Sequence, residues 1–586
     1  MKANILTILS LFLFGTFLCR SQVYKVHSHN DYEQNVPFWK AISAGVYSIE
    51  ADVFLKNGNL LVAHEPESIT DSRTLKRLYL EPLKDFLDLG PVNNSPLQFL
   101  IDIKSDAEPT LDAIVMELKE YPMITDSKDI TIVISGNRPD SSQYYKYPDF
   151  ISFDYQSLEL IDDPTILNKV GLISLSFRNF TDWNGKGRLT KEDLEKVSQV
   201  VARAHAFGKP FRFWATPDSK TAWKAIVALG VDYLNTDHPF ECVTYVNSLE
   251  KRVFENTGTS TVYSPTFSSD GSTHTPENII LLIVDGNGLA QISATALANG
   301  GTLSLTQLRN IGFLKTQSGD DFTTDSAGAG TALATGQKVP NRYIGRDSDR
   351  KSIPNLTEIL DKKGFSTAII TTDEITGATP ASFFAHQKDR SLSDAILKDL
   401  EKSSLELFVA GSPTPETASK NFDGFEKVAD LESLHLKRSA YFFPPDTIPA
   451  PLHTAVSSVL ETLNNAKKPF FLMVEGAKID SYGHANNIDG IIKEGIAFDR
   501  AVTEALKFAD ADSNTLVIIT ADHETGGLTL PQGDVDNHTI EADFTTDDHT
   551  GIFVPIFAYG PQSQRFQGVY GNHEVYYKIQ RVLGLE

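Results

Sequence analysis

Carboxylate and imidazole side chains follow several apolar runs in the C-terminal half of the chain. They lie in NIILLIVDGNG, VEGAKIDSYGH, TLVIITADH and DHTG, and they are Asp285, Glu475, Asp480, His484, Asp522, His523 and His549. In open α/β sheets, ligands bind beyond the carboxyl ends of the strands. Asp and His are the ligands that zinc takes where no thiol is at hand. A single Asp after a strand often only caps the next helix, but so many such residues after successive strands favour a metal centre.

A candidate nucleophile lies in TTDSAGAGTALATG, where Ser326 follows Asp325 and precedes an Ala- and Gly-rich run that can form a helix. Free N–H groups and the helix dipole at such a helix N-terminus favour a phosphate group. Taken alone, the serine is better explained as an ordinary N-cap.

A second set of polar residues lies in the N-terminal half, in HSHNDYEQ, SIEADV, LLVAHE and LIDIK. Glu50 and Asp52 point to the same side of a strand because they are two residues apart, and Asp102 joins them from the next strand to form an oxygen site for magnesium or calcium. His29 and His64 are expected to act as an acid–base pair, and Lys104 to neutralise a phosphate. The alternative is that the carboxylates are structural polar groups bonded to their neighbours.

The elements that position the N-terminal set are short apolar runs at fairly even intervals. They are YKVHSH, VYSIEADV, LLVAH, LQFLIDIK, ITIVIS, FISFD, LISLSF, FRFWAT and DYLNTD. We interpret LLVAH as an excursion after the second strand, which leaves eight strands alternating with helices. This pattern predicts a (β/α)₈ TIM-type barrel over residues 22–250, with an open doubly wound sheet as the alternative.

The C-terminal set is positioned by NIILLIVD, FSTAIITT, KPFFLMVEG, TLVIITAD and VPIFAYG, which are suited to central parallel strands. Helical patterns separate them, so residues 277–586 are predicted to form one large α/β domain. Residues 251–276 are rich in Ser, Thr, Gly and Pro and have no apolar period, so we interpret them as a linker.

The chain has 586 residues, which predicts two or more domains. Its net charge of -23 argues against a nucleic-acid partner. Residues 1–21 resemble a signal peptide, with Lys2, an apolar run over residues 5–18 and the small Ser21. We therefore expect a secreted or periplasmic protein with no stable membrane anchor. Loss of Cys19 with this segment leaves Cys242 alone, which excludes an intrachain disulfide and thiol metal sites.

The C-terminal motifs resemble those of alkaline phosphatases. DSAGAGTALATG resembles the nucleophile segment, and VDGNG, ITGATPASFFAH, VEGAKID with GH, TADH, and HTG with VPIFAYG follow in family order across residues 277–586. The resemblance implies an α/β/α sandwich, hydrolysis of phosphomonoesters and a phosphoserine intermediate. The sulfatase and nucleotide phosphodiesterase branches of the superfamily fit less well, because sulfatases use a different sequence context and the phosphodiesterases commonly use Thr.

The resemblance also implies ligand sets. One zinc is held by Asp480, His484 and His549, and the second by Asp285, Asp522, His523 and the Ser326 oxygen. Magnesium occupies a third site made of Asp285, Thr379 and Glu475, and Arg390 binds two phosphate oxygens. Family members often dimerise, so a homodimer is one outcome that the resemblance allows. Two positions depart from the family pattern: Gly377, where His or Asp is frequent, and Ser481, where Lys or His is frequent.

The N-terminal motifs resemble the phospholipase C-like phosphodiesterases, which include the glycerophosphodiester phosphodiesterases. HSHND is similar to their opening His motif, and EAD with AHE to their E-x-D and His. Asn30 stands where Arg is usual, and Asp102 where Glu is usual. The two resemblances together suggest a chain that acts on small phosphate esters, opening a phosphodiester in the barrel and releasing phosphate in the C-terminal domain. A barrel that only binds a ligand is the alternative.

Overall fold

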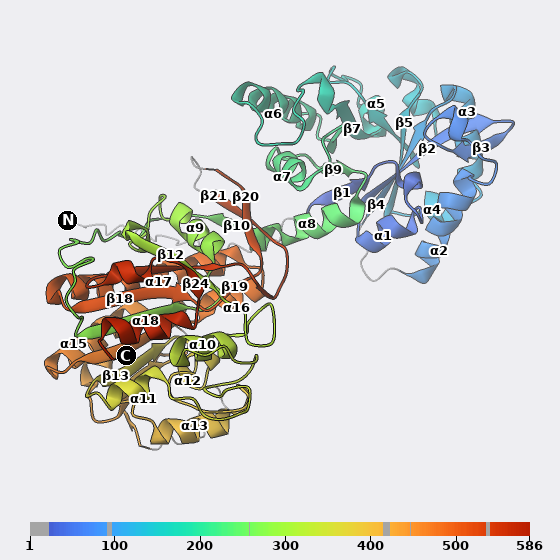
Figure 1. Ribbon diagram of the computed structural model, residues 1–586. Helices are drawn as coiled ribbons and strands as arrows, with labels where there is room; N and C mark the ends of the chain where they lie inside the picture. The colour runs from blue at the N-terminus through green and yellow to red at the C-terminus, as the bar shows by residue number, and fades with distance from the viewer. Residues whose placement is uncertain are drawn as a thin grey trace, which may run out of the picture. The chain divides into compact units, whose positions relative to one another are not determined.

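The computed structural model describes residues 23–585 apart from 91–95, 257, 414–421, 423, 446 and 535–538. The expected signal peptide, residues 1–21, lies outside the described residues. The chain divides into two compact units, Met1–Leu249 and Glu250–Glu586, whose elements are labelled in Figure 1. Of the helices in the described part, none is both long and apolar enough to cross a membrane.

The N-terminal unit is a closed barrel of eight parallel strands, which confirms the predicted fold. The barrel closes because β1 pairs with both β2 and β9. The strands are β1 Lys25–Ser28, β2 Ser48–Lys56, β4 Leu97–Ile103, β5 Ile130–Gly136, β6 Ile151–Tyr155, β7 Val170–Ser176, β8 Phe211–Trp214 and β9 Tyr233–Thr236. The LLVAH run is β3, Asn59–Val62, which turns back antiparallel on β2. As its place in the sequence indicated, β3 is an additional strand outside the ring of eight.

Helices connect the barrel strands and cover its outside. They include α1 Trp39–Ala44, α2 Glu81–Leu89, α3 Ala107–Leu118, α4 Pro122–Thr125, α5 Pro164–Lys169, α6 Lys191–His205, α7 Lys220–Ala228 and α8 Pro239–Arg252. Leu100, Val133, Leu172 and Tyr233, from four different strands, form one apolar cluster. The polar residues at the carboxyl ends of the strands lie above this filled core, at the face where barrel enzymes build their sites.

The segment predicted as a linker is bound to the C-terminal unit along much of its length. β10, Val253–Glu255, pairs with β21, Thr539–Phe544, which pairs in turn with β20, Leu528–Asp534. Farther along, the Asp510 carboxylate accepts hydrogen bonds from the Tyr263 hydroxyl at 2.7 Å and the Thr266 amide at 2.9 Å. The segment is therefore hydrogen-bonded to the C-terminal unit at these residues and is not a free linker there. Composition could not show this, because it does not reveal which polar groups have partners in the fold.

The C-terminal unit is built on a ten-stranded sheet, in the order β15-β16-β14-β13-β17-β11-β18-β23-β12-β24. The five predicted runs form β11 Asn278–Val284, β13 Ser366–Thr371, β17 Phe470–Gly476, β18 Thr515–Ala521 and β23 Val554–Tyr559. The remaining strands are β12 Asn310–Lys315, β14 Leu407–Ala410, β15 Glu426–Lys427, β16 Ser439–Phe442 and β24 Gly568–Gly571. The parallel direction expected for VPIFAYG is wrong, because β23 runs antiparallel to both β18 and β12.

Helical layers cover both faces of this sheet, which confirms the predicted α/β/α sandwich. Successive residues of β11 alternate between two apolar clusters: Ile280 and Leu282 pack on one side, and Ile279 and Leu281 on the other. The first layer contains α9 Leu289–Ala298, α15 Leu452–Asn465 and α17 Ile488–Asp512. The second contains α10 Ser326–Thr335, α11 Leu356–Asp361, α12 Ala378–Ala381, α13 Ser393–Lys402 and α18 Glu574–Val582.

Candidate functional site

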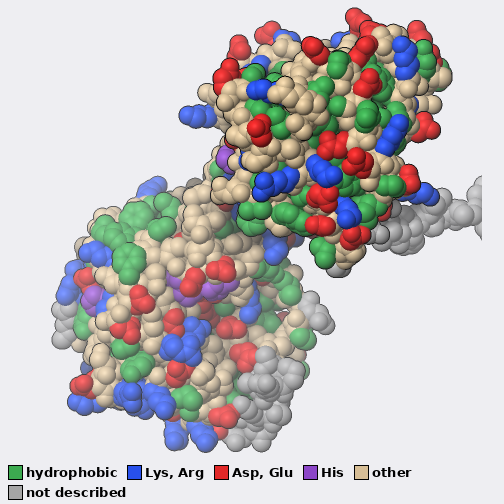
Figure 2. Space-filling view, turned by 90° about the vertical axis from the view of Figure 1, so that its right-hand side faces the viewer, with side chains coloured by type: hydrophobic (Ala, Val, Ile, Leu, Met, Phe, Trp, Pro, Cys, Tyr) green, Lys and Arg blue, Asp and Glu red, His purple; other side chains and the backbone are tan. Residues whose placement is uncertain are grey.

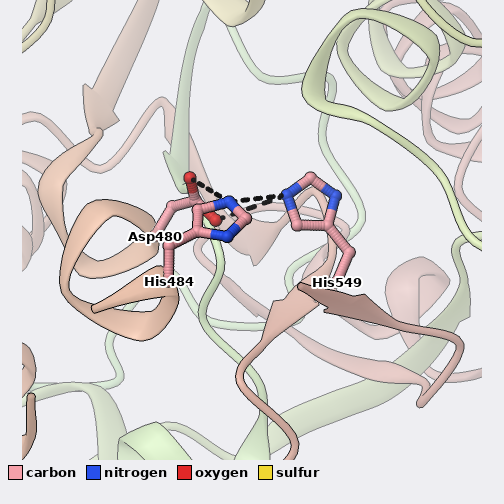
Figure 3. A group of neighbouring side chains, drawn as sticks. All are labelled: Asp480, His484 and His549. Carbon is pink, nitrogen blue, oxygen red and sulfur yellow. Dashed lines mark hydrogen bonds and ion pairs between the residues drawn. The ribbon is translucent and has the colours of Figure 1, made fainter. Parts of the chain in front are cut away.

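Two imidazoles and a carboxylate meet at the surface of the C-terminal unit (Figure 3). Asp480 and His484 are four residues apart on α16, Lys478–His484, so they share one face of the helix. His549 comes from β22, His549–Thr550. The His549 Nε2 atom lies 3.2 Å from His484 Nε2 and 3.5 Å from the nearer Asp480 oxygen. Figure 2 shows histidine side chains gathered with acidic ones on this unit.

Backbone carbonyls orient both imidazoles. His484 Nδ1 bonds to the Asp547 carbonyl at 2.6 Å, and His549 Nδ1 to the Thr324 carbonyl at 2.7 Å. Because a carbonyl only accepts, each Nδ1 carries a proton, so a ring that holds no second proton presents its Nε2 lone pair to its neighbour. Two facing lone pairs beside a carboxylate repel one another unless a cation lies between them. The donor set therefore fits zinc, with the ring orientation that metal-binding histidines usually have.

A second group lies at the carboxyl ends of the neighbouring strands β11 and β18. His523 Nε2 lies 3.5 Å from an Asp285 oxygen and 3.4 Å from an Asp522 oxygen. Among the described residues, Asp285 Oδ1 and Asp522 Oδ2 are buried and accept no hydrogen bond. Burial and the charge of Asp480 raise the pKa of Asp522 to about 7, and burial lowers the pKa of His523 well below its ordinary value. The two buried carboxyl groups thus have no cationic side chain of this group to balance their negative charge. A divalent cation bound between them would supply that balance.

Glu475 and Thr379 lie next to this group. Glu475, at the end of β17, is 1% exposed and accepts a short hydrogen bond from the Thr371 hydroxyl. Burial, followed by the charge of Asp373, raises the pKa of Glu475 to about 8. Its charge also contributes to the raised pKa of Asp285, after burial and the nearer carboxylates. Thr379, in α12, is buried, and its hydroxyl is without a hydrogen-bond partner among the described residues.

Ser326 is the first residue of α10, and its side chain faces His523. The Ser326 Oγ atom lies 3.4 Å from His523 Nε2, and the residue is 3% exposed. Asp325 caps the helix by accepting the Gly328 amide at 2.9 Å. Its other oxygen receives Arg390 Nη1 at 3.2 Å. The hydroxyl, the helix N-terminus and a guanidinium are therefore brought together beside the cation groups, and this arrangement suits a phosphate ester.

Supporting residues around the cation groups were missed from the sequence. The Thr525 hydroxyl donates to Asp480 Oδ1 at 2.6 Å. The buried Glu524 accepts the Gln291 side-chain amide at 2.7 Å and the Leu528 backbone N–H at 3.1 Å. Both residues directly follow the TADH motif, so their position in the sequence was the available signal.

The barrel brings Glu50, Asp52 and Asp102 together at one end. Asp52 and Asp102 are register partners on β2 and β4, and Glu50 lies two residues before Asp52. Lys104 Nζ is 3.0 Å from Asp52 Oδ2 and 3.3 Å from Asp102 Oδ1. Burial and the charge of Glu50 raise the pKa of Asp102 to about 7. Three carboxylates with one lysine form an oxygen-rich site that fits magnesium or calcium.

The two expected acid–base histidines lie on different sides of these carboxylates. His29 Nδ1 bonds to Asp237 Oδ1 at 2.8 Å, and its Nε2 is 4.0 Å from Glu50. Burial alone would lower the pKa of His29, but Glu50 and Asp237 raise it above its ordinary value. His64 Nδ1 lies 3.2 Å from Asp52 Oδ2 and 2.9 Å from the Tyr32 hydroxyl. Both histidines line one cavity of about 520 Å³, together with Glu50, Asp102, Lys104 and Arg212.

The sequence analysis did not identify His27 and Arg212, which both bond to Glu50 of this site. Arg212 Nη1 bonds to Glu50 Oε2 and Asn235 Oδ1, each at 2.9 Å, and also contacts His27. His27 is fully buried between Ser48 and Glu50, at 2.7 Å from each. Burial, with the charge of Arg212, lowers the pKa of His27 to about 3, so the ring is neutral. The HSH spacing, which puts His27 in β1 two residues before His29, was the signal for His27.

Comparison with known families matches both units. The alkaline phosphatase family model matches residues 276–406 and 444–540. The AIM6-like phosphodiesterase domain matches residues 17–139, and the glycerophosphoryl diester phosphodiesterase family matches residues 210–239. The two-part organisation expected from the motifs is therefore confirmed.

Individual relatives match the C-terminal part. Alkaline phosphatase 4 of Bacillus subtilis is 30% identical over 396 residues, which cover 50% of this chain and 86% of that protein. The alkaline phosphatase of Escherichia coli is 28% identical over 408 residues, covering 53% and 86%. The solved structure of the alkaline phosphatase from the Antarctic bacterium TAB5 is 36% identical and has a TM-score of 0.51, covering 54% of this chain and all of that chain. A variant of that enzyme has been solved with Mg bound in its M3 site.

The residues matched by the alkaline phosphatase family model include Ser326, Arg390 and the cation-binding candidates of the C-terminal unit except His549. The chain therefore belongs to the alkaline phosphatase family, and it is a phosphatase that also carries a phosphodiesterase-like barrel.

Proposed function

We propose that the C-terminal unit hydrolyses phosphomonoesters through a phosphoserine formed on Ser326. The observation that supports this most directly is the place of the Ser326 hydroxyl, buried at the N-terminus of α10 and 3.4 Å from His523. Backbone N–H groups of the first helical turn and Arg390 bind the phosphoryl oxygens, which places phosphorus against Oγ.

Zinc is assigned to Asp480, His484 and His549, and to Asp285, Asp522 and His523 with the Ser326 oxygen. Magnesium is assigned to Asp285, Thr379 and Glu475, whose donors are all oxygens. When bound, these cations supply positive charge that lowers the pKa of a hydroxyl and stabilises charge on a leaving oxygen. Magnesium in the M3 site of the TAB5 enzyme variant supports a separate magnesium position in this family.

Ser326 Oγ attacks phosphorus in line with the ester oxygen, so the Oγ–P bond forms as the P–O bond to the alcohol breaks. The proton that the Ser326 hydroxyl gives up ends on the departing alcohol. A water molecule then attacks the phosphoserine from the opposite side, which restores the hydroxyl and releases phosphate. Arg390 holds the equatorial oxygens through both displacements, because its guanidinium presents two parallel donors.

The test is Ser326→Ala in full-length, zinc-loaded protein, assayed with p-nitrophenyl phosphate. We expect turnover to fall by at least about 10³-fold, with zinc content unchanged because the other ligands of each zinc remain. Trapping with labelled phosphate at low pH should label the parent protein and leave the variant unlabelled. Full turnover in the variant would overturn the assignment.

The barrel is proposed to hydrolyse a phosphodiester with a magnesium or calcium ion at Glu50, Asp52 and Asp102. His29 and His64 line the same cavity as these carboxylates and are assigned proton transfer. Lys104, held by Asp52 and Asp102, is assigned to the negative charge of the phosphate. The alternative, a barrel that only binds ligand, predicts no diesterase activity in full-length protein and no effect of His29→Ala or His64→Ala on turnover.

The two activities are proposed to act in sequence on small phosphate esters, with the monoester from the barrel as substrate of the phosphatase. A full-length Ser326→Ala protein given bis-p-nitrophenyl phosphate should then stop at the monoester, whereas the parent releases inorganic phosphate. A cyclic phosphate as the barrel product would separate the two reactions. The acidic surface and the leader-like first 21 residues support a secreted or periplasmic protein without a nucleic-acid partner, and a homodimer remains a proposal for sedimentation to test.

A further inference from the structure

A carboxylate lies next to Gly377, one of the two positions that depart from the alkaline phosphatase pattern. An ideal Cβ at position 377 would lie 2.6 Å from Asp373 Oδ2 and 3.3 Å from the Asp373 carboxyl carbon. The backbone at Gly377 has φ -54°, which any residue adopts. A side chain at position 377 would therefore meet the Asp373 carboxylate and also the Glu374 backbone carbonyl oxygen, which lies 3.0 Å from the Cβ position. It is this lack of space, and not the backbone conformation, that favours glycine.

Asp373 is held in this place from two sides. Lys478 Nζ lies 3.3 Å from Asp373 Oδ1, and the Asp373 amide donates to the Thr371 hydroxyl oxygen at 2.9 Å. The Thr371 hydroxyl donates in turn to Glu475. The backbone of Asp373 and the Glu475 carboxylate are thus joined through one threonine.

An unpartnered hydroxyl marks the same place. Thr379 is 1% exposed, and its hydroxyl lies near Glu475 but makes no well-aligned hydrogen bond within the described part of the chain. Thr379 lies two residues after Gly377 in α12, whose N-cap is Gly377. A buried hydroxyl without a partner is costly unless an ion or water completes its bonds. Asp373, Glu475 and Thr379 offer oxygen donors only, which suits magnesium and not zinc.

We propose that Asp373 supplies the carboxylate of the magnesium site that position 377 lacks, while Lys478 pairs with the other oxygen of that carboxylate. The inference rests on the proposed function, because it assumes a magnesium position at Asp285, Thr379 and Glu475. Lys478 lies one helical turn before Ser481, the other position that departs from the family pattern, and both line a cavity of about 580 Å³ with Asp373. The Asp373–Lys478 ion pair thus lies beside positions 377 and 481, where this chain lacks the side chains of the family pattern.

The test is magnesium affinity, measured by titration calorimetry with MgCl₂ on full-length, zinc-loaded, magnesium-free protein. Removing a carboxylate that positions or contacts a metal typically weakens binding by about 10- to 100-fold. We expect Asp373→Ala to weaken magnesium binding by at least about tenfold on this basis, with zinc content unchanged. Lys478→Met is the matched control: it breaks the same ion pair but removes no oxygen donor, so it should not weaken magnesium binding by more than a small factor.

A second experiment moves the carboxylate from position 373 to position 377. In Asp373→Ala the space beside Gly377 opens on the side of the carboxylate, and the Glu374 carbonyl oxygen at 3.0 Å from the Cβ position is the remaining close contact. The double variant Asp373→Ala with Gly377→Asp should therefore recover part of the lost affinity. Parental affinity in Asp373→Ala, equal losses in Asp373→Ala and Lys478→Met, or no magnesium binding by the parent would each overturn the inference. These titrations contain no substrate, so they are separate from the Ser326→Ala assay, whose failure would refute the catalytic mechanism instead.

Discussion

Metal binding to the stripped protein should release protons at mildly acid pH. In the metal-free protein, burial raises the pKa of Asp522 to about 7 and that of Glu475 to about 8. At pH 6 both carboxyls therefore carry about two protons together, and at pH 9 only about a tenth of a proton. Since metal ligands bind as carboxylates, saturation with zinc and magnesium should release at least about two protons at pH 6 and far fewer at pH 9.

The number of released protons is measured by calorimetric titration of chelator-treated protein in buffers of different ionisation enthalpy. Glu494→Gln is the matched control, because burial also raises the pKa of Glu494 to about 7, yet Glu494 belongs to none of the cation groups. The control should release as many protons as the parent. Release of less than about half a proton at pH 6 would refute the view that these carboxyls are protonated in the metal-free protein and ionised in the loaded one.

The same shifts determine how stability depends on pH. A carboxyl whose pKa is raised on folding binds more protons in the native state than in the unfolded state between pH 4 and its folded pKa, so stability falls as pH rises through that window. The pKa of Asp522 rises from 3.8 to about 7, which corresponds to about 4 kcal/mol lost between pH 4 and pH 8. The unfolding midpoint of metal-free protein should fall across this range, and that of loaded protein should not.

Three further predictions concern single residues. Arg390→Ala should raise KM for p-nitrophenyl phosphate by about 10- to 100-fold, because charge-assisted hydrogen bonds are lost, and Arg390→Lys should recover only part of it. Thr525→Val removes the donor to Asp480 without changing shape and should weaken zinc binding by about tenfold, as measured by competition with a chelator. Arg212→Met leaves Glu50 buried without its cation and should cost about 3–5 kcal/mol in urea unfolding, whereas Lys493→Met, at an exposed ion pair, should cost under about 0.5 kcal/mol; equal costs would contradict the buried network.

Strand positions could be predicted because buried strands are short, largely apolar runs in the sequence. Each of the eight barrel runs became a strand, and LLVAH was separated from them by its distance from the preceding run. The direction of β23 could not be predicted in this way. A strand covered by helices on both faces is apolar throughout, so VPIFAYG has the same composition whether it runs parallel or antiparallel to β18.

The site residues in motifs could be predicted for a different reason, since parallel strands carry their ends to one edge of a sheet. Asp285 and Asp522 are far apart in the chain, yet β11 and β18 are neighbours that end together. Arg212 could not be predicted, because a single arginine in FRFW has no periodic signal. It reaches Glu50 only because barrel closure brings β8, β9, β1 and β2 into sequence around the ring.

A buried oxygen without a hydrogen bond indicates a cation only where the surrounding groups cannot balance its charge. Asp154 Oδ1 in the barrel is also buried and unbonded, but the other oxygen of that carboxylate accepts Ser135 at 2.8 Å and Ser174 at 2.6 Å. Neutral hydroxyl donors thus stabilise the Asp154 charge locally. Among the described residues no such donor bonds to Asp285 Oδ1, and the charges of Asp522 and Asp480 raise the pKa of Asp285 further after burial.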